Sequence, residues 1–448
     1  MTGDETRGDF SRRKMLALAG TGLVGSVAGC SSGGSGDPAE TTTEGDEPTT
    51  DGEPTTEGEP TTERTTTSEP AGFEVPEGGA YFGIEDGFAS VDDWVEDATV
   101  YKVTEPTREA LAAAVNNPEP RIVVFETSGT IDLGARRFTV EGDKCWIAGQ
   151  TAPSPGITLV RGGFWVNAND CVVQHLRVRP GDAGQAVGEW QPDTIRTADE
   201  TENNIVDHCT GTWSVDENIS PGYDSVGTTF SNCIVAEALN NSTHQKGDHA
   251  YGMLVGNGAT EVAIMGNVFA HNIARNPRLK AETESAVVNN LMFNYQEAID
   301  LDESTVTTVI GNTFDGGGPE NAHVEGGEGY IDGNVSKTEA RMTEAFDRYA
   351  GKLIWPTGLE AMDAADAEEH NLAYAGARPA DRTEHDERVI SKIQNGERGL
   401  IDSQSEVGGY PDLAENTHEV SVPDADRKDW LAAWAVAVEE EDVSPPSA

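Results

Sequence analysis

The chain has 448 residues, with 79 acidic against 30 basic side chains and a net charge of −49. A surface this acidic offers no broad basic face for phosphates, which excludes nucleic acid as a partner. Its carboxylates repel one another in dilute salt, whereas in molar salt the Debye length falls to roughly 3 Å and screens the repulsion. The composition therefore favours a protein adapted to molar salt over a mildly acidic secreted one.

The first 30 residues are typical of an export signal rather than of a folded element. Residues 11–16 contain a twin arginine, a mild apolar run too short to span a bilayer follows, and Val27–Cys30 resembles a lipoprotein processing site. Cleavage before Cys30 would leave a lipid-modified cysteine outside the cell, and ordinary cleavage with full release is the alternative. Residues 31–72 contain mainly Thr, Glu, Pro and Gly, so we expect a disordered acidic linker there. The protein is thus expected to be extracellular, either anchored to the cell surface or secreted.

A repeat organises the next part of the chain. Short apolar runs end at a polar residue at intervals of 25, 33, 24, 35, 23, 22 and 22 residues, at Gln150, His175, His208, Asn232, Asn267, Asn290, Asn312 and Asn334. A period of this length predicts an all-β fold, the right-handed parallel β-helix, in which neighbouring coils bury one another's apolar face. The polar residues are expected to stack as a ladder. The two long intervals, 176–207 and 233–266, must contain loops on one face, where we expect the functional site.

The boundaries of the folded part follow from this period. We assign residues 73–338 to the β-helix, which is the catalytic domain if the protein is an enzyme, 339–438 to a C-terminal region that wraps the solenoid, and 439–448 to a disordered tail. Residues 106–115 predict a short helix, with a Thr at its start, that caps the N-terminal end of the solenoid. A second helix is predicted at residues 426–436.

Four further cysteines lie in the folded part, at positions 145, 171, 209 and 233. Cys209 and Cys233 each follow a ladder residue, so they should stack in neighbouring coils about 4.8 Å apart. Stacked side chains are parallel, whereas a disulfide needs its two Cβ atoms turned toward each other. Buried free thiols are therefore favoured over a disulfide.

Several motifs in one order resemble those of secreted pectate lyases. They occupy residues 147–153, 177–182, 206–209, 213–217, 240–247, 275–278 and 399–409. The resemblance covers about residues 75 to 410. It implies a polysaccharide lyase that cleaves 1,4-linked polygalacturonate by β-elimination. Such a reaction removes the proton on C5 of a uronate and expels the sugar linked at C4.

The chemistry needs a partner for the uronate carboxylate, because a bare carboxylate leaves the neighbouring C–H very weakly acidic. Calcium suits this task as a hard cation that takes oxygen ligands. Asp193 in the first long loop, Asp216 and Glu217 are the candidate calcium ligands. In a chain this acidic, a solvated surface group is the alternative for each of them.

The resemblance also implies the groups that act on the substrate. Arg275 matches the arginine that serves as the base, and Lys246 matches a lysine that contacts the acid group of the substrate. Arg275 follows Asn267 by eight residues, as Asp216 follows His208, so the two should emerge on one face about 10 Å apart. Arg278, Lys280 and His244 are expected to bind further parts of the substrate. Pairing of these cations with nearby acids is the alternative.

The chain departs from the family pattern at two positions. Where the family often has two aspartates separated by one residue, this chain has Gln191, Pro192 and Asp193, and Thr212 stands where some members have another acidic ligand. Fewer carboxylates imply weaker calcium binding, or recruitment of Glu189, Glu217 or the substrate.

Two other functions remain open on the same scaffold. A polygalacturonase would use paired carboxylates that flank the bond, but the long loops contain no cluster of three aspartates followed by a histidine. A non-catalytic glycan-binding surface protein is the other alternative. In each case we expect a monomer whose partner is pectate or a related polyuronide. The preferred methylation of the substrate and endo or exo action do not follow from the sequence.

Overall fold

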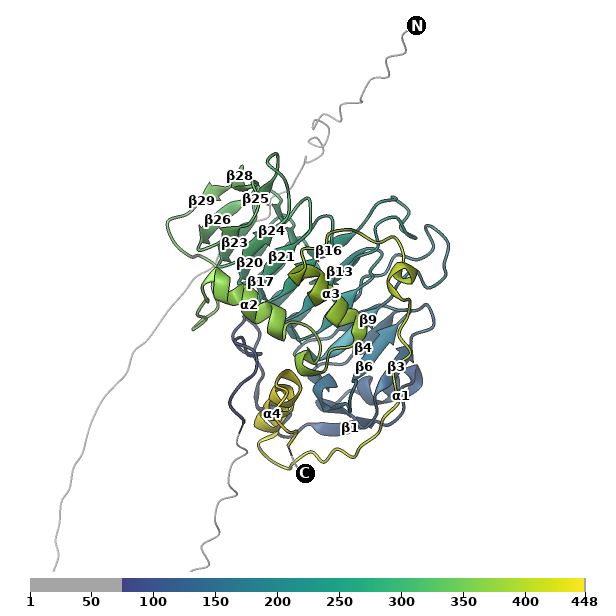
Figure 1. Cartoon of the computed structure of the whole chain (residues 1–448). Coiled ribbons are helices and arrows are strands. Elements are labelled where there is room, and N and C mark those ends of the chain that lie inside the picture. The colour runs from purple at the N-terminus through teal and green to yellow at the C-terminus, as the bar shows by residue number, and fades with distance from the viewer. Residues whose placement is uncertain (1–74, 447–448) are drawn as a thin grey trace, which may run out of the picture. The chain divides into compact units, whose positions relative to one another are not determined.

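A computed structural model describes residues 75–446. The predicted export signal, Cys30 and the linker as far as residue 72 lie outside the described residues. Three parallel sheets run along one axis (Figure 1), and successive coils of the chain each add one strand to each sheet. This is the parallel β-helix that the period predicted. None of the helices within residues 75–446 combines the length and the apolar character that crossing a membrane requires.

The first sheet begins at the capped end and contains eleven strands. In spatial order they are β1 (Thr99–Val103), β2 (Arg121–Phe125), β5 (Cys145–Ala148), β8 (Val172–Gln174), β11 (Glu202–Asp207), β14 (Val226–Ser231), β17 (Thr260–Met265), β20 (Glu284–Val288), β23 (Val306–Ile310), β26 (Glu328–Asp332) and β29 (Asp347–Arg348).

The second and third sheets have nine strands each. The second sheet contains β4 (Phe138–Glu141), β7 (Phe164–Asn167), β10 (Ile195–Thr197), β13 (Glu217–Ser220), β16 (Tyr251–Val255), β19 (Arg278–Leu279), β22 (Ile299–Leu301), β25 (Ala322–Glu325) and β28 (Arg341–Glu344). The third sheet contains β3 (Gly129–Asp132), β6 (Ile157–Val160), β9 (Leu176–Arg179), β12 (Thr210–Thr212), β15 (Ile234–Ala236), β18 (Val268–Ala270), β21 (Leu291–Phe293), β24 (Thr313–Asp315) and β27 (Val335–Ser336).

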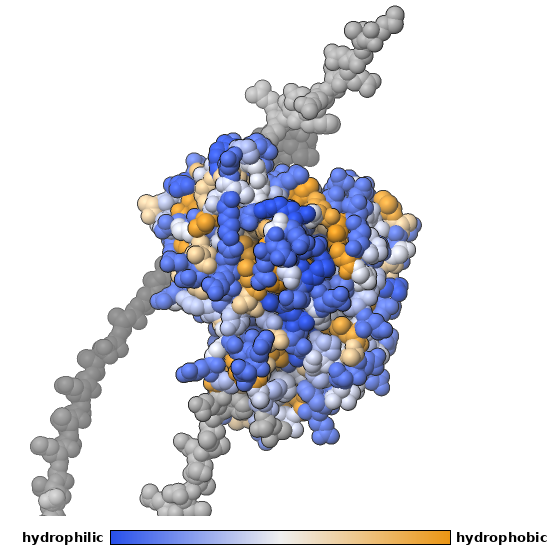
Figure 2. Space-filling model, viewed as in Figure 1, coloured by the Kyte–Doolittle hydropathy of each residue, from blue (hydrophilic) through white to orange (hydrophobic). Residues whose placement is uncertain are grey.

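The solenoid interior is a continuous apolar core between the three sheets. Alternating residues of each strand point inward and are buried, for example Val206, Phe230 and Ile264 on successive strands of the first sheet. Because every coil buries its apolar face against its neighbours, the core extends along the whole axis. The outward-facing residues make the surface in Figure 2, which is mostly hydrophilic with scattered apolar patches.

The polar ladder exists, but its register is not the predicted one. Amide side chains bond from Asn267 to Asn290, from there to Asn312 and on to Asn334, at 2.9, 3.0 and 2.9 Å. The strand register aligns Asp207 and Ser231 with Met265. The next residues, His208 and Asn232, are therefore level with Gly266 and not with Asn267. The prediction of a single ladder was therefore wrong by one residue in the first half. Two adjacent positions at the corner are polar, and a period read from the sequence does not separate them.

The buried thiols occupy the ladder position of the first half. The register pairs Asp207 with Ser231, which places Cys209 level with Cys233 in the next coil, and the Cys233 N–H donates to Oδ1 of Asn267 at 2.8 Å. All four cysteines of the described chain are free and buried. This agrees with the expected stacking of parallel side chains.

The N-terminal cap is the predicted helix. Helix α1 (Arg108–Val115) begins after Thr107, whose hydroxyl accepts a bond from the N–H of Ala110 at 3.2 Å. Leu111, Ala114 and Val115 are buried on the face that closes the solenoid core. An N-cap hydroxyl of this kind stabilises a short helix by about 1 kcal/mol.

The C-terminal region wraps the solenoid on two faces (Figure 1). Helices α2 (Ala364–Tyr374) and α3 (Glu384–Gln394) lie against the third sheet, where Val389 and Ile390 join an apolar cluster with Ile234 and Leu291. Asp386 of α3 also forms buried ion pairs with two arginines of β9, at 2.6 Å each. Helix α4 (Arg427–Glu439) packs on the first sheet. Short 3-10 turns complete the elements at Asp93–Val95, Gly149–Thr151, Pro379–Asp381 and Gln404–Val407.

Two of the predicted boundaries need correction. The strands continue to Arg348, ten residues beyond the expected end at 338, because β28 and β29 extend the stack after the polar period stops. The predicted tail begins too early, since Glu439 is the last residue of α4 and is buried. Its carboxylate and that of Glu440 accept bonds from the N–H groups of Ala80 and Gly79, each at 2.9 Å.

Candidate active site

The predicted site residues meet at one edge of the second sheet, where its strands begin. Asp193 lies just before β10, Glu217 is the first residue of β13, and Arg275 lies just before β19. Glu217 is in register with Tyr251 at the start of β16. Since adjacent coils are about 4.8 Å apart, the stack places these side chains on consecutive rungs. Both long intervals contribute loops here, 180–194 before β10 and 237–250 before β16, as predicted.

Three carboxylates form a compact cluster at this edge. Asp193, Asp216 and Glu217 each offer an oxygen, and these oxygens lie within 4.8 Å of one another. Asp193 and Glu217 are buried, while the Asp216 side chain is 35% exposed. The Glu217 N–H donates to Oδ1 of Asp193 at 3.3 Å, and Arg196 approaches the other oxygen at 3.6 Å. The sequence thus identified residues that the fold brings together as oxygen donors.

The cluster concentrates negative charge. Burial, and next the charge of Asp216, raise the pKa of Asp193 to about 6. Burial and the two neighbouring carboxylates raise the pKa of Glu217 well above its usual range. Asp216 differs: burial acts to raise its pKa, but the hydrogen bonds with His249 and Glu217, together with the nearby histidine charges, lower it overall. Carboxylates that repel one another in this way suit a hard cation with oxygen ligands, which would relieve the repulsion.

Arg275 faces the carboxylate cluster from two coils away. Its guanidinium contacts the carboxylate of Glu217 and lies over the ring of Tyr251, 4.0 Å from the ring centroid. The side chain is 21% exposed, so the guanidinium borders solvent. Its backbone adopts a φ of 61°, which turns the chain sharply before β19. Arg275 and the acids lie on one face as predicted, but Arg275 contacts Glu217 directly instead of lying about 10 Å away. Tyr251, which is level with Glu217, is bridged to Ala274 rather than to Arg275.

A pair of stacked histidines supports Asp216 from the second long loop. His249 bonds to the Asp216 carboxylate through Nε2 at 2.8 Å. The rings of His244 and His249 stack with centroids 3.5 Å apart and planes 6° apart. Burial, and next the neighbouring His249, lower the pKa of His244. The sequence indicated His244 but missed His249, whose only signal was its place in the same loop, three residues after Lys246.

The predicted substrate-binding cations have different surroundings. Lys246 is exposed, and its N–H donates to Nδ1 of His244 at 3.1 Å. Arg278 pairs with Asp300 at 3.0 Å and with Asp302 at 2.6 Å, and Lys280 lies 3.7 Å from Asp302. Arg278 and Lys280 are thus already partnered by carboxylates, so a substrate at this position would compete with two acids.

The two departures from the family pattern have local explanations. Gln191 accepts a bond from the N–H of Gln245 at 3.4 Å, which links the two long loops. Thr212 lies in β12 of the third sheet, where its hydroxyl accepts a bond from Arg179. Neither replaces a carboxylate at the cluster. Glu189 is exposed.

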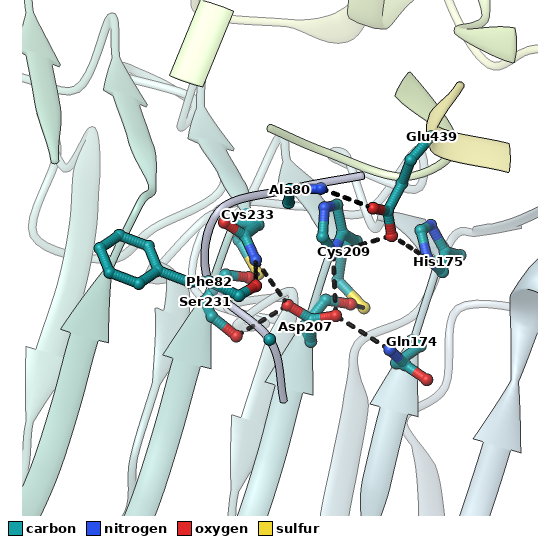
Figure 3. A network of polar contacts seen from close by, with 12 residues as sticks. Ala80, Phe82, Gln174, His175, Asp207, Cys209, Ser231, Cys233 and Glu439 are labelled. Carbon is teal, nitrogen blue, oxygen red and sulfur yellow. Dashed lines mark hydrogen bonds and ion pairs between the residues drawn. The ribbon is translucent and has the colours of Figure 1, made fainter. Parts of the chain in front are cut away.

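A second group of possible metal ligands lies on the first sheet, under α4 (Figure 3). Glu439 lies 3.4 Å from Nε2 of His175 and 3.7 Å from Nδ1 of His208, and His208 is 2.8 Å from Asp207. Nδ1 of His175 accepts the N–H of Arg378 at 3.2 Å, so the proton of the neutral ring is on Nε2, facing Glu439. A metal ion at Nε2 needs the opposite tautomer. We therefore interpret this group as an ion-pair network that fastens α4 to the solenoid.

Comparisons with known proteins agree with the fold and with the motifs. No family model matches the chain. A probable pectate lyase C of Aspergillus flavus is 29% identical over 334 residues, covering 69% of this chain and 75% of the relative. A probable pectate lyase C of Neosartorya fischeri is 29% identical over 361 residues, covering 72% and 79%.

Solved structures support the architecture. A Bacillus subtilis pectate lyase variant superimposes with a TM-score of 0.52 at 14% identity, covering 68% of this chain and 98% of its own. Another pectate lyase, solved to study substrate specificity and the anti β-elimination mechanism, gives a TM-score of 0.51 at 14% identity, covering the same shares. The fold is a parallel β-helix of the kind these lyases have, and the predicted resemblance to pectate lyases is confirmed.

Proposed function

We propose that the protein is a pectate lyase that cleaves 1,4-linked polygalacturonate by β-elimination. The observation that carries this proposal is the carboxylate cluster of Asp193, Asp216 and Glu217 facing Arg275, on a fold and a sequence similar to those of pectate lyases. The resemblance supplies the reaction, and the geometry supplies groups of the required kinds at one edge of the sheet.

The three carboxylates fit a calcium ion, because they offer several oxygens within 4.8 Å and repel one another without a cation. Calcium bound there would neutralise the uronate carboxylate and so acidify the proton on C5. With Asp216 held by His249, the cluster has one fixed and ionised member. The proposed ligands are Asp193, Asp216 and Glu217.

Arg275 is the proposed base. A guanidinium is ordinarily always protonated, so it needs a special setting to accept a proton. In the structure Glu217 holds the guanidinium as an ion pair. Release of Glu217 from Arg275 removes the anion that favours the protonated form, so that the guanidinium can lose a proton to solvent water. The neutral guanidine then has an unprotonated nitrogen that takes the C5 proton. The electron pair of the C–H bond then forms the C4–C5 double bond as the sugar oxygen on C4 leaves.

The remaining cations would position the substrate. Lys246 is exposed beside His244 at the edge of the same loop, where its ammonium can bind a uronate carboxylate. Arg278 can bind a carboxylate bidentately once it releases Asp300 or Asp302. Lys280 and His244 complete the proposed substrate contacts.

The observed spacing weighs against the hydrolase alternative. Glycosidases separate their two catalytic carboxyl groups by about 5–5.5 Å for retention or 6.5–9.5 Å for inversion. In this cluster one oxygen from each of three carboxylates lies within 4.8 Å of the other two, a convergence on one point rather than two groups that flank a bond. Their proximity suits shared coordination of a cation better than acid and base on opposite sides of a bond.

The test is the ultraviolet absorbance of unsaturated product from polygalacturonate, in high salt with calcium. We expect growing absorbance for the wild type and none for Arg275→Ala or for the wild type with a chelator. Arg348→Ala, which removes an exposed arginine on β29, is the matched control and should behave as the wild type. New reducing ends without unsaturation would establish a hydrolase instead, and glycan binding without any product would establish a binding protein.

We also propose export through the twin-arginine signal and attachment to the membrane by a lipid on Cys30, with the mature protein acting as a monomer outside the cell in molar salt. The motif at Val27–Cys30 and the net charge of −49 support this. Mass spectrometry of the mature N-terminus tests the lipid. An unmodified terminus, or one created elsewhere, would establish release.

A further inference from the structure

The solvent-facing side of the second sheet has unlike ends. The strand order β4, β7, β10, β13, β16, β19, β22 and β25 places the carboxylate cluster near its middle. Beyond β19 the lining of one pocket is mainly acidic, with Glu297, Asp300 and Glu325 beside Arg278. On the other side of the cluster, at β4 and β7, two arginines and two tryptophans line a pocket of about 400 Å³.

We call this second hollow the Arg-Trp pocket and define it by Arg136, Arg137, Gly163, Trp165, Trp190 and Pro192. Arg137 lies over the ring of Trp165, with its guanidinium carbon 3.9 Å from the ring centroid. Arg136 and Arg137 are exposed, and both tryptophans are partly exposed. Within residues 75–446, neither arginine forms an ion pair with a carboxylate.

Two adjacent unpaired cations are unusual in this chain, in which acidic residues outnumber basic ones 79 to 30. The nearby Arg196 shows the usual arrangement, since it pairs with Asp199 at 2.6 Å and lies 3.6 Å from Asp193. Arg136 and Arg137 instead present donors to solvent, with Arg137 held over the ring of Trp165. A guanidinium binds carboxylates bidentately.

The backbone connects the pocket to the carboxylate cluster. Trp165 is in register with Arg196 of β10, and the N–H of Phe164 donates to the carbonyl of Thr194 at 2.7 Å. A Cβ at Gly163 would lie 2.3 Å from the carbonyl oxygen of Asp193, so only glycine permits this close approach. The pocket therefore lies one to two coils, roughly 5–10 Å, from the cluster along the solenoid axis.

We propose that the Arg-Trp pocket is a binding subsite for a further uronate of the same polysaccharide chain. This deepens the proposed function and rests on it for the identity of the polymer. Arg136 and Arg137 bind the sugar carboxylate, and Trp165 positions the guanidinium of Arg137, which lies over its ring. The polyanion thus extends from the cluster to the β4 side, and affinity increases with chain length on that side.

Binding without turnover tests the subsite independently of the reaction. Two proteins are compared, both in an Arg275→Ala background. One retains Arg136 and Arg137, and in the other both are replaced by Gln. Titration calorimetry measures the affinity of each for oligogalacturonates from dimer to octamer. The salt is the lowest that preserves the native circular dichroism spectrum. We expect the octamer to bind the double variant about tenfold more weakly, which corresponds to about 1.4 kcal/mol and lies within the range of two exposed carboxylate contacts. The dimer, held at the cluster, should change by less than about twofold on the same reasoning.

Two controls separate this proposal from a general effect of charge. Lys352 lies over Trp355, 3.4 Å from its ring centroid, on the segment that packs against the first sheet. Lys352→Gln should leave the affinity for every oligomer unchanged. Fully methyl-esterified octamer has no carboxylates, so its affinity should not respond to the loss of Arg136 and Arg137.

The outcomes are distinct from those of the lyase assay. Equal weakening of dimer and octamer, no weakening of either, or no binding of any galacturonate by the Arg275→Ala protein would each overturn the subsite. Absence of unsaturated product from the wild type would overturn the lyase, while a length-dependent loss of affinity in the double variant would still support the subsite. Trp165→Ala gives a second test, because it removes the ring over which Arg137 lies, and it should also weaken the octamer more than the dimer.

Discussion

The ion-pair network under α4 makes the stability of the protein depend on pH through His208. Burial alone would lower the pKa of this histidine, but the negative charges of Asp207 and Glu439 raise it to about 9. A histidine whose folded pKa lies above its unfolded value of about 6.5 stabilises the protein fully below pH 6.5. This stabilisation is lost as the pH rises toward 9.

The size of the effect follows from the shift. One pKa unit corresponds to about 1.36 kcal/mol, so linkage predicts that the contribution of His208 falls by about 2 kcal/mol between pH 6 and pH 8. Unfolding of roughly 370 described residues at about 2.1 cal/mol/K per residue converts this to about 2 °C in the melting temperature. The comparison stops at pH 8, because cysteines of an unfolded chain ionise near pH 8.5 whereas burial raises the folded pKa of Cys209 to about 12.

The assay is the melting temperature of the wild type and of His208→Gln across this range. The advantage of the wild type over the variant should shrink by about 2 °C from pH 6 to pH 8, on the linkage argument above. His271→Gln provides a control of opposite sign. Burial lowers the pKa of His271 to about 4, so protonation of the unfolded chain costs the wild type stability at pH 6, and its advantage over this variant should grow with pH. Parallel pH profiles of the wild type and His208→Gln would refute the reasoning.

Two further outcomes follow from buried charge. Asp386→Ala leaves Arg177 and Arg179 buried without their carboxylate and should cost about 3–5 kcal/mol in denaturant unfolding, whereas Asp412→Ala at an exposed position should cost nothing measurable. Equal midpoints for these two variants would contradict that account. Because the pKa of Asp193 is raised to about 6, protons should compete with calcium below that pH, so calorimetric calcium affinity should fall by about tenfold from pH 7 to pH 5. An affinity that does not change over this range would remove Asp193 from the proposed site.

The fold was predictable because each coil has an apolar face of the same kind, which must be buried against the neighbouring coils. Apolar runs and corner residues recur at nearly constant intervals, and a solenoid is the arrangement that buries them. The exact register was not predictable, since His208 and Asn267 are both polar corner residues although they occupy adjacent positions of the coil. Only the pairing of Asp207 with Ser231 and Met265 resolves them.

The candidate site was predictable only in part. Asp216 and Arg275 could be located because they lie in motifs that resemble those of pectate lyases. Their equal distances from His208 and Asn267 were a poor guide, since these two residues occupy adjacent positions of the coil. His249 could not, because its bond to Asp216 joins two coils through a loop whose path has no period. The role of Glu439, which the sequence analysis assigned to a disordered tail, could not be predicted either. Its stabilising contacts are with residues more than 200 positions away in the chain.

The bonds from Glu439 and Glu440 to Ala80 and Gly79 bring the two ends of the described chain together on the first sheet. Because the two ends lie side by side, we expect the fold to tolerate a different starting point of the polypeptide. A short peptide that joins residue 440 to residue 78 should allow new termini to be opened in an exposed turn, such as the one at Asn257, without loss of the solenoid. Circular permutation would then move the point of attachment of a fusion partner from the region beside α4 to the turn between β16 and β17.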